Sequence, residues 1–489
     1  MTHLSRRGFL AASAAAAAPF FLPARAFASP PALSLRATTR TLDIAGRAVT
    51  VKGLLDQQGR SGLFLDPAQP FRVDLWNDVG TETSIHWHGQ VPPNVQDGVP
   101  GSPLPALKPG EMRSFDFVAY PGTHWMHSHI PVQEMELLAA PLIVRRPEDV
   151  TADRQEVTIL LHDLSFRPAD EVLAEITGGS MAGMDHGAGH ATGGSVGGMG
   201  GMMGGMSGMD QGAMGGMAMD LNDFNFDAYL ANDRTLDDPE VVTVDKGGRV
   251  LLRVINGAAA TVFWIDTGSL PGRAVATDGN PIQPVSGARF GLAMGQRLDI
   301  ELEVPAEGGA FPILALREGA VERTGIILAT SGAVVGKISG ASDEAHPAFS
   351  ADLVQEAGFR ALTPLADRPF DRTDSLMLNG SMMPYVWTID GQSWGTHRIV
   401  EARSGERVAL TFHNMSMMAH PMHLHGHHFQ VVALNGTPLR GAFRDTVHVP
   451  PMSMVTVALD AGEAARWMLH CHHMPHLATG MMTEFVIAA

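Results

Sequence analysis

The sequence predicts an all-β protein made of three consecutive Greek-key β-sandwich domains, and three observations support this. Short apolar runs alternate with turns rich in Pro, Gly, Asn and Asp, as at 71–77, 250–255 and 407–412. This alternation is typical of β-sandwiches. Long amphipathic helical patterns are absent, and 489 residues are too many for one hydrophobic core.

An internal repeat sets the number of domains at three. Each copy runs from a strand that ends in Asn, through a loop, into a second strand (Asn77, Asn256 and Asn414). Nine and eleven residues after the Asn, the outer copies carry paired histidines and the middle copy does not: His86 and His88, His423 and His425, against Ile265 and Thr267. We therefore expect domains at 29–150, 151–340 and 341–489, with metal chemistry shared between the first and the third.

The first 28 residues match an export signal. Arg6 and Arg7 precede an Ala-rich apolar run that ends in a small-x-small cleavage pattern, as in a twin-arginine signal peptide. The alternative is a retained membrane anchor, but Pro19 and Pro23 interrupt a run already short for a span. We expect a periplasmic protein without a membrane span. The net charge of −17 argues against nucleic acid as a partner, and we expect a monomer.

The only cysteine, Cys471, lies between His470 and His472. In an extended strand successive side chains face opposite ways, so the thiolate would face one metal site and both imidazoles another. Two His, one Cys and a distant Met form blue copper sites, and His476 and Met481 follow in the same stretch. The alternative is a buried structural cysteine beside surface histidines.

The repeat supplies the missing histidine, His420, which stands six residues after Asn414. The first domain has residues that cannot hold copper at the positions aligned with His420, Cys471, His476 and Met481, namely Thr83, Ser128, Gln133 and Leu138. We therefore predict one such copper, in the last domain.

Four His-x-His pairs stand at 86/88, 127/129, 423/425 and 470/472. The spacing of two places both rings of a pair on one side of a strand, and eight imidazoles suit a three-copper cluster with room for oxygen. A lone pair would more often be surface histidines. The motifs His86-Trp87-His88-Gly89, His127-Ser128-His129, 420–426 and 470–472 resemble the four copper motifs of three-domain multicopper oxidases, which include laccases and bacterial copper-efflux (cuprous) oxidases.

The resemblance implies cupredoxin-like domains and four copper ions. It places a type 1 copper on His420, Cys471, His476 and Met481 and a type 2 copper on His86 and His423. The type 3 pair would be held by His88, His127, His129, His425, His470 and His472. It further implies one-electron oxidation of substrate at type 1, coupled to reduction of dioxygen to water at the trinuclear cluster.

Three further positions concern protons and ligand support. Asp97 matches an acidic residue that delivers protons in relatives; the alternative is a turn Asp before Gly98. Efflux oxidases often carry Glu where this chain has Leu477, which leaves a second proton relay unassigned. Asp445 is either a hydrogen-bond partner behind a ligand imidazole or a simple turn or salt-bridge residue.

Methionine is concentrated in two places. Ten of the 28 lie in the Gly-rich segment 178–220, which we interpret as a flexible insertion in the middle domain, and thirteen lie from Met377 onward. Thioethers select Cu(I), so these residues suit copper capture. The alternative is a disordered linker or an adaptable apolar surface.

Three functional hypotheses remain open. The first is a cuprous oxidase of periplasmic copper tolerance that also has laccase activity. The second is a general laccase acting on phenols and aromatic amines. The third is a non-catalytic copper-binding protein, which the intact ligand set disfavours.

Overall fold

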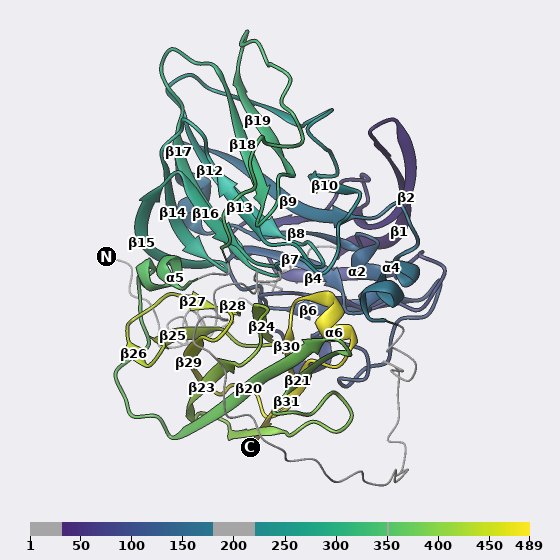
Figure 1. The fold of residues 1–489 in the computed structure, drawn as a ribbon, viewed down its shortest axis with the longest axis vertical. Coiled ribbons are helices and arrows are strands. Elements are labelled where there is room, and N and C mark those ends of the chain that lie inside the picture. Colours follow the sequence, from purple (N-terminus) through teal and green to yellow (C-terminus); the bar gives the residue numbers. More distant parts are fainter. Residues whose placement is uncertain (1–31, 179–220, 350–351) are drawn as a thin grey trace, which may run out of the picture. The chain divides into compact units, whose positions relative to one another are not determined.

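The computed structural model describes residues 32–178, 221–349 and 352–489, and these residues form six β-sheets with only short helices (Figure 1). The sheets occur in three pairs, and each pair draws its strands from one continuous stretch of chain, 33–144, 155–330 or 372–488. The all-β prediction is therefore confirmed. The domain boundaries at 150/151 and 340/341 remain predictions.

The first pair contains two four-stranded sheets. One has the order β2 (Arg47–Asp56), β1 (Leu33–Ile44), β4 (Phe71–Asn77), β6 (Met112–Phe117). The other has the order β3 (Leu63–Leu65), β8 (Ala139–Val144), β7 (Gly122–Ser128), β5 (Ile85–His86). Apolar side chains from both sheets share one core. Strand β4 alternates buried and partly exposed residues, as expected for a sandwich strand.

The second pair has a six-stranded and a five-stranded sheet. The six-stranded order is β10 (Ala228–Ala231), β9 (Gln155–Leu164), β12 (Arg249–Asn256), β17 (Arg297–Glu303), β14 (Gly272–Thr277), β15 (Asn280–Gly287). The five-stranded order is β11 (Val241–Val244), β19 (Arg323–Thr330), β18 (Ala310–Arg317), β13 (Phe263–Asp266), β16 (Arg289–Leu292).

The third pair has a seven-stranded and a five-stranded sheet. The larger has the order β21 (Tyr385–Ile389), β20 (Arg372–Met382), β23 (Arg407–Asn414), β29 (Met454–Asp460), β25 (Phe429–Leu434), β26 (Thr437–Pro438), with β27 (Phe443–Arg444) also on β25. The smaller has the order β22 (Val400–Arg403), β31 (Met482–Ala488), β30 (Arg466–Cys471), β24 (His420–Leu424), β28 (Thr446–Val449).

The helices are short connectors: η1 (Asn94–Gln96), α2 (Pro131–Met135), α3 (Pro147–Thr151), α4 (Ala169–Ile176), α5 (Val354–Gly358) and α6 (Met474–Ala478). Helices α2 and α6 begin with proline in the first turn, where the missing N–H costs nothing. No helix in the described part of the chain is long and apolar enough to cross a membrane. The predicted signal peptide and nearly all of the Met-rich insertion (179–220) lie outside the described residues.

The sequence repeat appears as a repeat of topology. The orders β2-β1-β4-β6, β10-β9-β12-β17 and β21-β20-β23-β29 are equivalent, and in each the central pair is parallel. The repeated asparagines, Asn77, Asn256 and Asn414, end the third strand of each set. Each of their side-chain amides donates to a carbonyl of the following loop, and each side-chain oxygen accepts from the N–H two residues on. One residue thus fixes the loop that leads into β5, β13 or β24.

Candidate metal centres

Strand pairing aligns the four His-x-His motifs. In the first sheet pair His86 on β5 lies opposite His127 on β7, and in the third His423 on β24 lies opposite His470 on β30. Because ladder partners lie side by side, each sheet presents a small patch of imidazoles.

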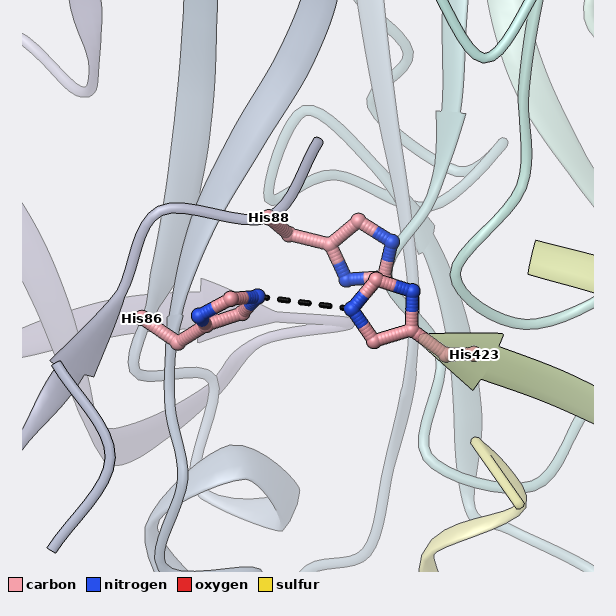
Figure 2. Close-up of side chains that lie close together, drawn as sticks. All are labelled: His86, His88 and His423. Carbon is pink, nitrogen blue, oxygen red and sulfur yellow. Dashed lines mark hydrogen bonds between the residues drawn. The ribbon is translucent and has the colours of Figure 1, made fainter. Parts of the chain in front are cut away.

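The two patches meet each other. The Nε2 atoms of His86 and His423 lie 3.4 Å apart, and the ring of His88 joins them from the loop after β5 (Figure 2). Two further groups of three have their ring nitrogens within 4.8 Å of one another: His88, His127 and His472, and His129, His425 and His470. The structure therefore gathers all eight predicted histidines.

These imidazoles are buried, and seven of the eight have a lowered pKa. Burial, with the neighbouring His86 adding, lowers the pKa of His425 to about 4, and burial lowers the pKa of His472 to about 3. Burial and mutual repulsion also lower the pKa values of the following residues well below the usual range: His88, His127, His129, His423 and His470. A neutral imidazole has a free lone pair, which is the form that binds metals.

The arrangement fits a metal cluster. The Nε2 atoms of His425 and His470 face each other at 3.0 Å, and those of His129 and His470 at 3.4 Å. Both ring nitrogens of His472 are buried without a hydrogen-bond partner. Buried imidazoles whose ring nitrogens point at one another suit a shared cation, because unpartnered buried polar atoms are costly.

The second centre lies on the other face of β30. The Sγ of Cys471 is 3.7 Å from Nδ1 of His420 and 3.6 Å from Nδ1 of His476, and these two nitrogens are 3.1 Å apart. The point equidistant from the three atoms lies about 2 Å from each, which is a metal–ligand bond length. Burial raises the pKa of the Cys471 thiol, and metal binding would remove that proton.

Met481 belongs to the same buried core cluster as Cys471. The N–H of Cys471 donates to the carbonyl of Met481 at 3.0 Å, and the N–H of Met481 donates to the carbonyl of His476 at 3.0 Å. The predicted residues of this centre therefore lie together. The centre is next to the histidine cluster along the chain, because the two neighbours of Cys471, His470 and His472, belong to that cluster.

Asp97 is not a simple turn residue. It is 2% exposed, its Oδ2 accepts from Nδ1 of His425 at 2.8 Å, and its carbonyl accepts from Nδ1 of His86 at 3.0 Å. Burial alone would raise its pKa, but the two histidines hold the pKa of Asp97 below its usual range. Gly98 follows with φ +88°, and a side chain there would collide with the carbonyl of Ile85.

Asp445 contacts two of the predicted ligand imidazoles. Its Oδ1 accepts from Nε2 of His88 at 3.0 Å, and its carbonyl accepts from Nδ1 of His423 at 2.9 Å. Arg297, which is fully buried at the start of β17, grips both oxygens of Asp445, at 2.7 Å for one of them. For Asp445 the structure shows both a hydrogen bond to His88 and a salt bridge to Arg297.

Two carboxylates at these centres were missed by sequence reasoning. Glu134 on α2 accepts from Nδ1 of His127 at 2.8 Å, and burial together with the charge of Asp163 raises the pKa of Glu134 well above its usual range. Asp223, whose side chain is fully buried, lies 3.6 Å from Nε2 of His476 and accepts a hydrogen bond from the hydroxyl of Tyr385. No spacing in the sequence links either residue to its partner.

Leu477, where a carboxylate could have stood, is 3% exposed and packs among apolar side chains. It is part of α6, which lies against α2. This position therefore contributes packing rather than charge.

Comparison with protein families matches three sequence models described as multicopper oxidase, at residues 63–149, 191–333 and 367–489. Among curated proteins, the multicopper oxidase MmcO of Mycobacterium tuberculosis is 32% identical over 84% of this chain and 78% of its own length. Copper resistance protein A of Escherichia coli is 25% identical over 93% of both chains. Laccase-2 of Botryotinia fuckeliana is 24% identical over 83% of this chain and 72% of its own.

Solved structures share the fold. A variant of the McoA multicopper oxidase from Aquifex aeolicus superposes with a TM-score of 0.68 at 20% identity, covering 95% of this chain and 97% of its own. Fet3p, described as a multicopper oxidase that functions in iron import, gives a TM-score of 0.71 at 14% identity, covering 92% and 90%. The fold is thus three consecutive cupredoxin-like Greek-key sandwiches.

Proposed function

Because the chain belongs to the multicopper oxidase family and is an oxidoreductase of the laccase and copper oxidase type, we propose that it is a cuprous oxidase of copper tolerance. It would oxidise Cu(I) to Cu(II) and reduce dioxygen to water. The observation that carries the choice of substrate is a group of exposed methionines beside the Cys471 centre.

The resident cofactor is proposed as four copper ions. His420, Cys471, His476 and Met481 would hold the type 1 ion, and His86 and His423 the type 2 ion. The type 3 pair would be held by two sets of three: His88, His127 and His472, and His129, His425 and His470. Copper, when bound, supplies one-electron oxidation at the first centre and four-electron reduction of dioxygen at the cluster.

The protein's own residues would do three things. Cys471 is covalently joined to His470 and His472, so its backbone is the shortest bonded connection between the two centres. Asp97, held against His425 and His86, is placed to pass protons to the cluster. Burial of every ligand excludes water from both centres.

The exposed methionines gather at one end of the seven-stranded sheet. Met415 and Met417 lie in the loop that leads from β23 to His420, and Met452 precedes the neighbouring strand β29. Their exposed fractions are 43%, 49% and 62%, and Met383 in the β20–β21 turn is 89% exposed. Exposed thioethers are costly to solvate and are soft ligands that prefer Cu(I).

The loop is coupled to the metal centre. The Oγ of Ser416 bonds Nε2 of His420 at 2.8 Å, and the N–H of Met415 donates to the carbonyl of Leu378 at 2.9 Å. An ion captured by Met415 or Met417 would therefore bind within a few residues of a copper ligand. The Met-rich segment 179–220 would add capture capacity.

A general laccase is the second candidate, favoured by the relatives named laccase. Phenols need an open pocket at the electron-accepting centre. Among the described residues, His420 and His476 are fully buried, and the cavity next to Met418 and His473 measures about 10 Å³, the space of roughly one water molecule. This small space supports an ionic substrate over an aromatic one.

We propose export to the periplasm by the twin-arginine pathway. Support comes from the paired arginines of the first 28 residues and from the relatives named copper resistance protein A. The proposed partners are dioxygen and Cu(I), with phenolic compounds as secondary substrates.

Steady-state kinetics with Cu(I) and with a phenol, with and without added Cu(II), test the proposal. Replacing Met383, Met415, Met417 and Met452 with Leu keeps apolar volume and removes the thioethers. We expect kcat/KM for Cu(I) to fall about tenfold while the phenol value stays constant, because only the soft ligands are lost. Met112→Leu is the matched control, since Met112 is also 43% exposed but lies on β6 of the first sheet pair.

Deleting 180–219 tests the segment separately: Cu(I) turnover should fall and phenol oxidation should persist or rise. Unchanged Cu(I) kinetics in both variants would reject the proposed role of the methionines in capturing Cu(I). A parent that oxidises the phenol but not Cu(I) would favour the laccase. A chain that takes up copper without colour or turnover would instead be a copper-binding protein.

A further inference from the structure

Three carboxylates surround the histidine cluster, and each lies against one imidazole from either terminal sheet pair. Asp97 lies between His86 and His425, at 3.3 and 2.8 Å. Asp445 lies between His88 and His423, at 3.0 and 3.7 Å. Of the four remaining histidines, His127 and His472 lie in one group of three with His88.

Glu134 stands in the same relation to this third pair. Its Oε2 is 2.8 Å from Nδ1 of His127, on β7, and its Oε1 is 3.9 Å from Nδ1 of His472, which follows β30. Both the Oε1 atom and the Nδ1 of His472 are buried without a hydrogen-bond partner. An acceptor and a donor thus face each other about 1 Å beyond hydrogen-bond length.

We propose that Glu134 is a positioning residue that holds His127 and His472 together across the junction of the first and third sheet pairs. Glu134 accepts from the Nδ1–H of His127, as the carbonyl of Ser128 also does at 2.9 Å, and it would accept from that of His472 once the 3.9 Å gap closes. It would then fix the tautomer that leaves the Nε2 of each ring free for a metal. The Nε2 of His127 already lies 3.3 Å from the Nδ1 of His88, the third member of this group. The inference rests on the proposed copper cluster and adds to it a residue that controls one type 3 ion.

A packing role alone does not explain a carboxylate here. Glu134 is 1% exposed, and within the described ranges its ion pairs are with these two imidazoles and with no Lys or Arg. A buried carboxylate without a countercharge is costly, and an apolar residue of similar size would be the stable choice in the core between α2 and α6. A cation bound by His88, His127 and His472 would supply the missing positive charge.

Asp445 differs in having its own countercharge. Asp445 forms an ion pair with Arg297, so Asp445 stays paired with or without a bound metal. Glu134 has no such partner among the described residues, so its contribution depends on the metal. This difference makes the two roles separable by experiment.

The test uses the copper-loaded full chain and its Glu134→Gln variant. Glutamine keeps the size and can accept from one Nδ1–H, but its NH₂ group cannot accept from the second. We expect the cluster to lose copper at about 10- to 100-fold lower chelator concentration, while the blue copper is retained. Paramagnetic resonance should show a new copper signal once the coupled pair is broken.

Glu136→Gln is the matched control. Glu136 directly follows the same helix, but its side chain is 33% exposed and pairs with Lys52. This variant should match the parent in chelator resistance and in resonance spectrum. Glu134→Leu provides a second test: its metal-free form should melt no lower than the metal-free parent, because a lone buried carboxylate is removed.

Unchanged copper retention and spectrum in both Glu134 variants would overturn the inference. Equal loss of blue and cluster copper, or a lower melting temperature of the metal-free variants, would assign Glu134 to packing and also overturn it. A parent that takes up no cluster copper would instead reject the proposed function, which the parent's copper content reveals before any variant is compared.

Discussion

The hydroxyl of Thr83 donates a 2.6 Å hydrogen bond to the side-chain oxygen of Gln133. The same oxygen accepts from the hydroxyl of Ser128 at 2.9 Å. These three residues occupy the positions that the repeat aligns with His420, His476 and Cys471. The first sheet pair therefore fills its version of the copper site with a satisfied polar network, which offers neither sulfur nor imidazole to a metal.

Cys471→Ser should remove all blue colour and all turnover. The first sheet pair has no substitute thiolate, and a serine hydroxyl is a poor ligand for copper of this type. Visible absorption of the copper-loaded protein and oxygen uptake measure the two effects. Ser128→Ala, at the equivalent position of the first sheet pair, should keep both colour and turnover. Colour or activity in the Cys471 variant would reject the assignment of this centre.

Asp223→Asn should raise the reduction potential of the blue copper. A carboxylate 3.6 Å from Nε2 of His476 stabilises the more positive, oxidised metal, and the amide removes that charge. Redox titration of the blue band measures the shift. Tyr385→Phe is the control, because it removes a hydrogen bond to Asp223 and keeps the charge. A potential that is unchanged or lower in the Asn variant would contradict the prediction.

Arg297→Met should lower the free energy of unfolding by about 3–5 kcal/mol, because it leaves Asp445 without its buried partner. Denaturant unfolding of the metal-free chain measures the loss. Arg273→Met on β14 removes an ion pair from a side chain that is 55% exposed, and should change stability by less than about 1 kcal/mol. A similar loss of unfolding free energy in the two variants would show that burial of the Arg297–Asp445 pair does not affect stability.

Glu484 should make the fold sensitive to acid. Burial raises its pKa, but hydrogen bonds from His397 and Arg466 bring the pKa from 4.5 down to about 2. A depressed pKa stabilises the fold above pH 4.5, and this stabilisation is lost as pH falls toward 2.

Glu484→Gln should therefore lower the free energy of unfolding by about 1 kcal/mol at neutral pH and leave it unchanged near pH 2. The loss at neutral pH is small because Arg466 is half exposed and solvent screens its charge. Denaturant unfolding across this pH range measures it. The control Glu401→Gln, at an exposed position of β22, should show no such pH dependence. A difference between parent and Glu484→Gln that is constant with pH would contradict the assignment.

The repeat and the histidine spacing were sufficient to predict the fold class and to name residues that the structure brings together. Alternation along a strand is a local property, so His470, Cys471 and His472 could be assigned to opposite faces without coordinates. The loop asparagines explain why the offset to the following strand is constant: their side chains fix the loop by hydrogen bonds to its backbone.

The supporting residues could not be found in this way. His88 and Asp445 are 357 positions apart, and their 3.0 Å contact depends on how two sheet pairs meet. Glu134 lies on a helix of five residues, too short to show a periodic pattern. Arg297 comes from the sheet pair that lacks the paired histidines, so the spacing of the ligands does not point to it.

The grip of Arg297 on Asp445 has a practical consequence for anyone who wishes to shorten this chain. A chain reduced to the first and third sheet pairs would keep every proposed ligand. It would lose the guanidinium of Arg297, which holds Asp445 against His88. Metal uptake should therefore depend on the second sheet pair as much as on the first and third. A shortened chain would need another cationic side chain beside Asp445.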